Sequence, residues 1–300
     1  MRTLLATGGI VSAIILPPLH AQSSSPSPTE IAAANNEESS WSPDGKKMAF
    51  DSNRADGKNY NVYVLDVASA SLNRLTTSAA NDITPAWSPD GKTIAFTSDR
   101  TGHNEIYLMG ADGSVMRQLT HDGSDDIHPS WSPDGKKVIY CSARNNPDPV
   151  KAPEGERYEI YEINIGGSQP RQVTDLGGIN TFPNYSPDGR RIAFRKVLGK
   201  SDSEVWVMDS DGKNPRNVTN NPAFDGWPSW SPDGEWLAFA SNRGGSDYNV
   251  YTMRVDGTEV RQLTNLKGRC TSPKWAPGGS KISFDHAAYG HCGIMVVATR

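Results

Sequence analysis

The sequence of 300 residues predicts an all-β fold, a propeller of six blades that each contain a four-stranded antiparallel sheet. Three observations lead to this class. The decapeptide WSPDGKKMAF, which begins at Trp41, recurs five more times along the chain. The copies follow one another at intervals of 44 to 54 residues, a period typical of propeller blades. Each interval also contains several short apolar runs that are separated by residues typical of turns.

Every copy of the decapeptide starts at an aromatic residue. The copies begin at Trp41, Trp87, Trp131, Tyr185, Trp230 and Trp275. The last copy, WAPGGSKISF, has lost the serine and the aspartate of the motif. Six copies predict six blades over residues 35–300.

The second unit shows how one blade is built. Its four apolar runs predict four strands: Ala86–Trp87, Thr93–Thr97, Ile106–Met109 and Arg117–Thr120. Gly, Asp, Pro or Ser separates each run from the next, so the runs form an antiparallel meander.

The Ser-Pro-Asp-Gly part of the decapeptide is suited to a tight turn between the first and second strands. Proline presets φ at the second position, and glycine adopts the left-handed conformation at the last. The aromatic residue before the turn is large enough to fill the space between neighbouring sheets. An Asp-Gly pair makes a second turn, between the third and fourth strands. The decapeptide is therefore scaffold and not an active-site motif.

The sixth unit ends after its third strand, and an open sheet edge is prone to aggregation. We expect residues 22–34 to close the ring by supplying the missing strand near Thr29–Ala33. In the other units, the motif Arg-x-Leu/Val-Thr forms the fourth strand at a fixed spacing before the next aromatic residue. Counting back by this spacing from Trp41 reaches Thr29.

Residues 1–21 indicate a secretory signal peptide, with Arg2, an apolar run and a cleavage site after Ala21. A membrane anchor is the alternative, but the apolar run is shorter than a bilayer requires. We expect no later segment to cross a membrane, so the mature protein is placed in the periplasm or outside the cell. The pI near 5.9 and the net charge of −4 argue against a nucleic-acid partner.

The repeated pattern W-S-P-D-G-K-x-Φ-A-F, followed by S-x-R, I-Y-x-M, D-G and R-Q-L-T, resembles the repeats of TolB-type six-bladed propellers. The resemblance implies an exported platform that binds proteins of the cell envelope. We expect no N-terminal α/β domain of the TolB kind before Trp41, so a full role in the Tol system is not implied. Similar propellers also occur as polysaccharide lyases that hold a metal with histidines.

Repeat geometry distinguishes two faces of the propeller. The Ser-Pro-Asp-Gly and Asp-Gly turns lie on one face, here called the turn face, which is nearly the same in every blade. The opposite face, the variable face, carries the links into each first strand and the loops between the second and third strands. Function tends to reside where loops vary over a rigid scaffold, so we expect the site on the variable face.

The position five residues before the aromatic is polar in five of the six units. Four of these residues are predicted to bind a ligand at the channel mouth: Asp82, Asp126, Asn180 and Asp225. They would receive a cation, a basic peptide end or sugar hydroxyls. The alternative is that they cap turns through the backbone.

The position three residues before the aromatic is not uniform. In blades three to five it holds His128, Phe182 and Trp227, which we expect to form an amphipathic wall for a partner segment or a carbohydrate ring. The alternative is packing between neighbouring blades.

Three further features of the sequence are an insertion, a repeated triplet and a pair of cysteines. The insertion NNPDPVKAPEGER before Tyr158 either reaches over the channel mouth or is a tolerated surface insertion. The S-x-R triplets of four units are expected to tie strand ends to neighbouring blades. Whether Cys270 and Cys292 form a disulfide stays open.

Catalytic motifs are sparse. The sequence has no Gly-x-Ser-x-Gly elbow, no His-Glu-x-x-His and no phosphate-binding glycine loop, and His128 is the single histidine expected near the axis. We expect no catalytic residue, no metal and no cofactor. The predicted function is a non-enzymatic propeller that binds a protein or peptide partner. The alternative is a carbohydrate-active lyase or hydrolase that uses the carboxylates and His128 as acid or base.

Overall fold

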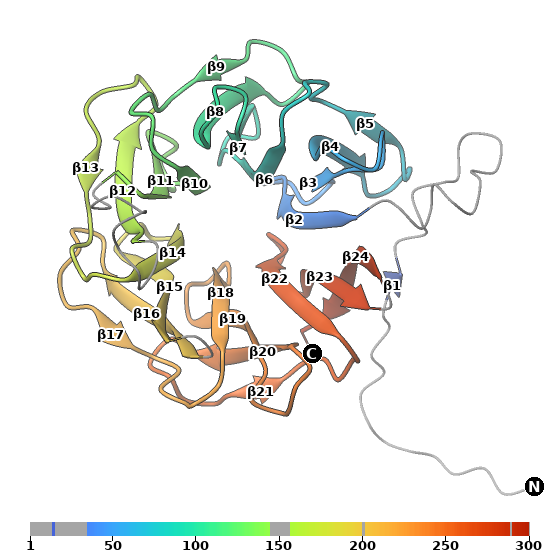
Figure 1. Ribbon diagram of the computed structural model, residues 1–300. Helices are drawn as coiled ribbons and strands as arrows, with labels where there is room; N and C mark the ends of the chain where they lie inside the picture. The colour runs from blue at the N-terminus through green and yellow to red at the C-terminus, as the bar shows by residue number, and fades with distance from the viewer. Residues whose placement is uncertain (1–13, 16–34, 145–156, 200–201, 289, 300) are drawn as a thin grey trace, which may run out of the picture.

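The computed structural model describes residues 14–15, 35–144, 157–199, 202–288 and 290–299. These residues form six four-stranded antiparallel sheets arranged around a central axis (Figure 1). Among them there is no α-helix. The described part of the chain accordingly offers no helix that is long and apolar enough to cross a bilayer. The predicted six-bladed propeller is confirmed.

The strands follow one another from the axis outward in each of the first five blades. Blade one contains β2 (Asn36–Trp41), β3 (Lys47–Ser52), β4 (Asn61–Asp66) and β5 (Leu72–Arg74). Blade two contains β6 (Asp82–Trp87), β7 (Thr93–Ser98), β8 (Glu105–Gly110) and β9 (Arg117–Gln118). Blade three contains β10 (Asp126–Trp131), β11 (Lys137–Ser142), β12 (Glu159–Asn164) and β13 (Arg171–Gln172). Blade four contains β14 (Ile179–Tyr185), β15 (Arg191–Gly199), β16 (Asp202–Asp209) and β17 (Arg216–Asn217). Blade five contains β18 (Asp225–Trp230), β19 (Trp236–Ser241), β20 (Asn249–Arg254) and β21 (Arg261–Gln262). Blade six contains β22 (Arg269–Trp275), β23 (Lys281–Ala288) and β24 (His291–Ala298).

The Ser-Pro-Asp-Gly turns form as predicted. In blade two, the Gly91 amide donates to the Ser88 carbonyl oxygen over 2.9 Å, and Gly91 has a φ of +70°. The Ser88 hydroxyl and the Lys92 amide both donate to Asp90 Oδ1, over 2.6 and 3.0 Å. Glycine is needed at the end of this turn because L side chains rarely adopt that φ.

The leading aromatic residues fill the space between blades, also as predicted. Trp87 of blade two packs against Val62 and Val64 of blade one, and against Phe96 of its own second strand. Trp131 and Trp230 occupy the equivalent places between blades two and three and between blades four and five. Burial of such large side chains contributes much of the stability of the ring.

Blade six meets blade one, so the ring is closed. The hydroxyls of Ser39 and Ser283 lie 3.0 Å apart, and the Glu38 amide donates to Asp285 Oδ2 over 3.0 Å. Residues almost 250 positions apart in the sequence are thereby joined.

The outer position of blade six is held by β1 (Ile14–Ile15), which pairs antiparallel with β24. Ile14 lies opposite Val296 and Ile15 lies opposite Met295. This strand belongs to the predicted signal peptide. The expected closing strand near Thr29–Ala33 lies outside the described residues and stays a prediction.

Each inner strand contains a β-bulge at the position three residues before its aromatic. The residue there has a left-handed backbone with φ between 48° and 56° in all six blades, and we call these the bulge residues: Glu38, Thr84, His128, Phe182, Trp227 and Ser272. This conformation is uncommon for side chains other than glycine. Because it occurs in every blade, it is a property of the scaffold, and the blades differ in the side chain that they place on it.

Candidate functional site in the central channel

Bulge residues line a cavity of about 370 Å³ on the axis. Its walls include Glu38, Thr84, His128 and Phe182, together with Lys274. Further lining comes from the aromatic and proline residues that flank the Ser-Pro-Asp-Gly turns, so this cavity lies toward the turn face. The bulge residues therefore lie along the channel between the turn face and the variable face.

Bulge amides bind the second strand of the preceding blade. The Thr84 amide donates to Asp51 Oδ1 over 3.0 Å, just as the Glu38 amide donates to Asp285. The acceptor in each case is the residue directly after the buried aromatic of the second strand. In blade order this second-strand position holds Asp51, Thr97, Cys141, Arg195, Ala240 and Asp285. Two variable rings of residues thus surround the channel.

His128, Phe182 and Trp227 lie together, as the sequence analysis expected of a wall. The rings of His128 and Phe182 are stacked with centroids 3.7 Å apart, and those of Phe182 and Trp227 are 5.6 Å apart. Phe224 and Tyr248 extend the cluster toward the variable face, with centroids 5.8 and 6.3 Å from that of Trp227. The three side chains pack on one another, and His128 and Phe182 also line the channel cavity. Their contact with a partner segment or a carbohydrate ring stays a prediction.

The three predicted aspartates have a different setting. Asp82, Asp126 and Asp225 have no exposed surface, and each is paired with an arginine of its own blade. The nitrogen-to-oxygen distances are 2.8 Å from Arg100 to Asp82, 3.2 Å from Arg144 to Asp126 and 2.7 Å from Arg243 to Asp225. These carboxylates are not an open ring at the channel mouth.

The arginines of the S-x-R triplets complete this repeated network. Arg100 Nε donates to Ser98 Oγ over 2.9 Å, and its guanidinium lies 4.5 Å from the centroid of Tyr107. The other three triplets repeat the bond from arginine to serine. The expectation that these arginines bind neighbouring blades is therefore wrong: they join the first and second strands of one blade, because the side chain reaches the start of its own inner strand.

Burial raises the pKa of two of the aspartates. It outweighs the attraction of Arg144 and raises the pKa of Asp126 to about 7. For the same reason the pKa of Asp225 rises to about 6, although Arg243 opposes the change. Proton uptake by these groups is thus linked to folding.

Blade four departs from this network at every position. Asn180 takes the place of the aspartate, Lys196 that of the serine and Leu198 that of the arginine. Asn180 is fully buried, and its Nδ2 donates to the carbonyl oxygens of Tyr158 and Gly177 over 3.2 Å each. Lys196 Nζ donates to the Gly177 carbonyl oxygen over 2.9 Å. Leu198 is left 49% exposed.

Arg195 is the central residue of blade four that the sequence analysis missed. Its guanidinium carbon lies 5.0 Å from the ring centroid of Phe182, 5.3 Å from that of Trp227 and 5.5 Å from that of Phe224. Its Nε donates to Thr181 Oγ1 over 3.0 Å. Burial lowers the pKa of Arg195 to about 10, so it remains charged at neutral pH. The available signal was its place in the second-strand position, where no other blade has a basic residue.

The other side of the channel is acidic. Glu38, Asp51 and Asp285 come from blades one and six, and burial raises the pKa of all three carboxyl groups. The Ser272 hydroxyl donates to Glu38 Oε1 over 2.8 Å, and Asp285 Oδ1 is buried without a hydrogen-bond partner. The channel therefore has an acidic side and a side that is aromatic and cationic.

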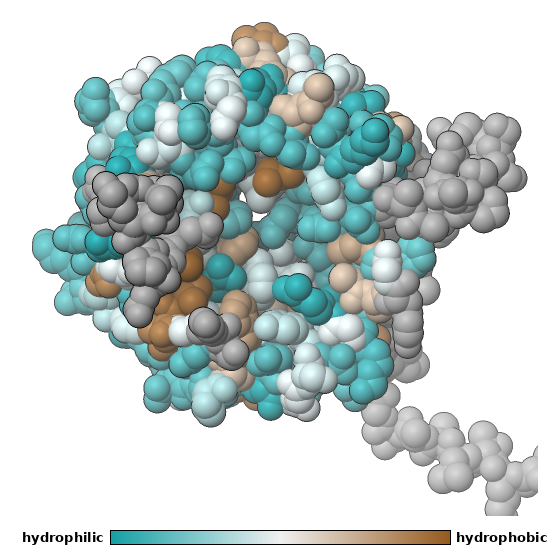
Figure 2. Space-filling view, viewed as in Figure 1, coloured by the Kyte–Doolittle hydropathy of each residue, from teal (hydrophilic) through white to brown (hydrophobic). Residues whose placement is uncertain are grey.

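Figure 2 shows the variable face with an opening at its centre. Hydrophobic residues gather at the lower left of the opening, over the strands of blade four. This is the side on which Leu198 is exposed and Arg195 meets the aromatic cluster.

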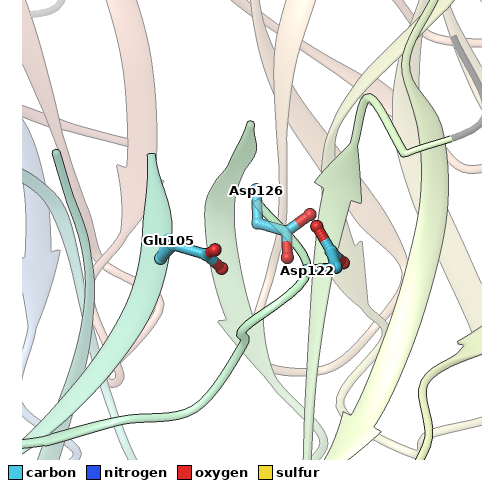
Figure 3. A group of neighbouring side chains, drawn as sticks. All are labelled: Glu105, Asp122 and Asp126. Carbon is cyan, nitrogen blue, oxygen red and sulfur yellow. The ribbon is translucent and has the colours of Figure 1, made fainter. Parts of the chain in front are cut away.

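One carboxylate group in the described residues has the spacing of metal ligands: Glu105, Asp122 and Asp126 (Figure 3). The three side chains face one another from β8, a loop and β10. Glu105 is already bonded to the Thr120 hydroxyl and the Gly123 amide, and Arg144 is paired with Asp122 and Asp126. The bonds of Glu105 recur at Glu159 in the next blade, so they are part of the scaffold.

The three thiols are unbonded to one another. Cys141 Sγ lies 3.4 Å from His128 Nδ1, but burial raises the pKa of Cys141 to about 12 and lowers that of His128 well below its usual range. Both groups are therefore neutral at pH 7, and the pair does not supply a thiolate nucleophile. Cys270 and Cys292 are separated by β23.

These arrangements define a six-bladed propeller whose central channel is lined by different side chains in different blades. The chain belongs to the TolB beta propeller domain family, whose model matches residues 20–154 and 153–300. The putative TolB from Agrobacterium tumefaciens is 26% identical with a TM-score of 0.69, over 88% of this chain and 90% of that one. TolB from Acinetobacter baumannii is also 26% identical, with a TM-score of 0.68, over 80% of this chain. The match spans 57% of the length of that protein.

An oligogalacturonate lyase in complex with manganese shares the fold alone, with 15% identity and a TM-score of 0.63 over 89% of this chain and 90% of that one. A search of curated proteins gave no match.

Proposed function

We propose that this protein is an exported, non-enzymatic propeller that binds a protein or peptide partner of the cell envelope through its variable face. One observation carries the proposal. At the variable end of the channel, Phe182, Phe224 and Trp227 surround the half-buried Arg195. Tyr248 packs on two of these rings, and the exposed Leu198 lies on the same blade as Arg195. Aromatic residues and arginine are enriched among the residues that dominate protein interfaces.

The chemistry of the described residues supports binding over catalysis. The predicted aspartates are paired with arginines, and His128 is covered by Phe182 and kept neutral by burial. A general acid or base needs an accessible proton and a pKa near the working pH. The resemblance to TolB and the signal peptide that the sequence predicts support a location in the periplasm or outside the cell.

Site-specific photocrosslinking in cells tests the proposal. A photoreactive phenylalanine at Leu198 is expected to capture one defined partner. The matched control is the same label at Val260, which is 42% exposed, near the 49% of Leu198, but lies beside a turn of the opposite face. Equal capture from both positions, or capture from Val260 alone, would contradict a binding site on the variable face.

The carbohydrate-active alternative has a simple test of its own. Purified protein is incubated with uronate and neutral polysaccharides, and absorbance and reducing ends are measured. We expect no product; turnover that is lost in Asp126→Ala or His128→Ala would replace the binding proposal.

A further inference from the structure

The half-buried arginine of the aromatic cluster differs from the three half-buried arginines that follow the second strands of blades two, three and five. Arg100, Arg144 and Arg243 each have an aspartate partner. Arg195 forms no ion pair with any residue that the structure describes, and only its Nε makes a hydrogen bond there. A guanidinium has five N–H donors, and the terminal nitrogens of this half-buried side chain have no acceptor among the described residues. The terminal nitrogens of Arg195 are therefore available to a ligand.

The neighbouring blade makes room for this side chain. A Cβ atom on Gly226 would lie 2.8 Å from Arg195 Cδ, closer than real contacts allow. In the other blades the position of Gly226 holds larger residues, in blade order Glu37, Ile83, Ile127, Thr181 and Thr271. The one glycine of this series thus stands beside the one arginine of the second-strand position. The small residue of blade five thus makes space for the arginine of blade four, which indicates that the two residues together form a site.

The acceptor that fits such a site is a carboxylate. A carboxylate binds a guanidinium through two parallel hydrogen bonds, and such charge-assisted bonds are stronger than neutral ones. The rings of Phe182, Phe224 and Trp227 lie within 5.5 Å of the guanidinium carbon and cover part of it, and a lower local dielectric strengthens its interaction with an anion.

The opposite side of the channel carries three carboxyl groups whose pKa is raised by burial. Glu38 is close enough to Arg195 for the two charges to influence each other, and Asp51 and Asp285 lie beside Glu38. The chain as a whole has a net charge of −4. One guanidinium pairs with one carboxylate, which a peptide with a single acidic residue between neutral residues supplies.

We propose that Arg195 receives one carboxylate from an acidic residue of the partner's peptide segment, and that an adjacent apolar side chain of that segment packs on the cluster of Phe224 and Tyr248. This inference rests on the proposed function and names the chemistry that the site recognises. It makes Arg195, with Gly226 as the residue that positions it, the determinant of specificity.

A matched pair of peptides tests the inference by calorimetric titration. The probes are acetyl-Gly-Phe-Asp-Gly-amide and the same peptide with Asn for Asp, which differ by one charge. Wild-type protein is expected to bind the Asp peptide about 10-fold more tightly. Arg195→Lys and Arg195→Met should each abolish this preference. Gly226→Ala should reduce it without removing any charge, because the new methyl group displaces Arg195.

Controls separate the outcomes. Arg191→Met removes an arginine of the same strand that lies over Trp230 at the turn face, and it should leave the preference unchanged. Equal binding of the two peptides, no binding of either, or a preference that survives Arg195→Met would overturn the inference. Tighter binding of tetragalacturonate than of the Asp peptide would assign the site to a uronate instead. If the crosslink at Leu198 persists while the two peptides bind equally, the carboxylate inference fails and the proposed function stands.

Discussion

Blades two and four show how one repeat serves two purposes. In blade two, Arg100 joins Asp82 and Ser98 into one network through an ion pair and a hydrogen bond. In blade four the same three positions hold Asn180, Lys196 and Leu198. The amide and the ammonium still bind loop carbonyls, but the leucine is exposed. A position that stabilises one blade is therefore free in another to face a partner.

The comparison also explains why Arg195 is distinctive. Blade two has Thr97 at the equivalent position, whose hydroxyl bonds that of Thr84 over 2.9 Å. In blade four the bulge residue and its neighbour are Phe182 and Arg195, which form part of one aromatic and cationic cluster. The bulge itself has nearly the same φ in both blades, 51° at Thr84 and 54° at Phe182, so at this position the blades differ in their side chains.

The largest effect is expected from opening the network of blade two. Asp82→Ala leaves the partly buried Arg100 without its partner and should lower the free energy of unfolding by roughly 3 kcal/mol. Asn180→Ala in blade four removes the hydrogen bonds of the amide to two carbonyl oxygens and to Glu159 Oε2. It should cost only about 1.5 kcal/mol, because Glu159 keeps its bonds from Thr174 and Gly177. Urea denaturation measures both. Equal losses would show that the two networks contribute equally to the free energy of unfolding.

A smaller effect is expected at the edge of blade six. Cleavage of the predicted signal peptide after Ala21 removes β1. The sequence predicts that residues 22–34 then provide the outer strand of blade six. Removing residues 22–34 should lower the melting temperature by about 5 °C or more, because an outer strand and its contacts are lost. An unchanged melting temperature would reject closure by this segment.

Proton binding by the buried aspartates makes the free energy of unfolding depend on pH. The amide that replaces the aspartate in blade four does not titrate and makes no such contribution. In the folded state the pKa of Asp126 is about 7, above its ordinary value of 3.8, so the folded chain binds a proton between these values that the unfolded chain does not. Stability should therefore fall as the pH rises from about 4 to 7. Asp126→Asn, which copies the amide of blade four, should reduce this slope by about 1 kcal/mol per pH unit. Urea denaturation at pH 5 and pH 7 measures the slope, and a variant with the slope of the wild type would contradict the assignment.

The smallest change in stability is expected at the exposed apolar residues. Leu198→Ser and the control Val260→Ser should each stay within about 0.5 kcal/mol of the wild type. Only Leu198→Ser should weaken capture of the partner, which a pull-down with equal amounts of folded protein would show. A loss that is equal in the two variants would place the binding surface elsewhere.

The repeat made the scaffold predictable from the sequence. The aromatic, Pro and Gly positions of the decapeptide each have one local physical role, and the structure places them in it. The bulge was not foreseen, because the six bulge residues share no side-chain type, and only their φ angles reveal what they have in common.

The site was predictable only in part. The grouping of His128, Phe182 and Trp227 follows from their shared place in successive blades. Spacing alone placed Asp82 and its equivalents near the axis, but it did not show that an arginine 18 residues later covers each carboxylate. The pairing of Arg195 with Gly226 joins two different blades at two different repeat positions, and no single repeat pattern contains it.

The most direct test of the account exchanges the differing residues of blade four for those of blade two. The variant carries Asn180→Asp, Arg195→Thr, Lys196→Ser and Leu198→Arg. The account predicts a folded propeller that melts at or above the temperature of the wild type, and that no longer captures the partner at the variable face or prefers the Asp peptide. A folded variant that binds both as the wild type does would contradict it.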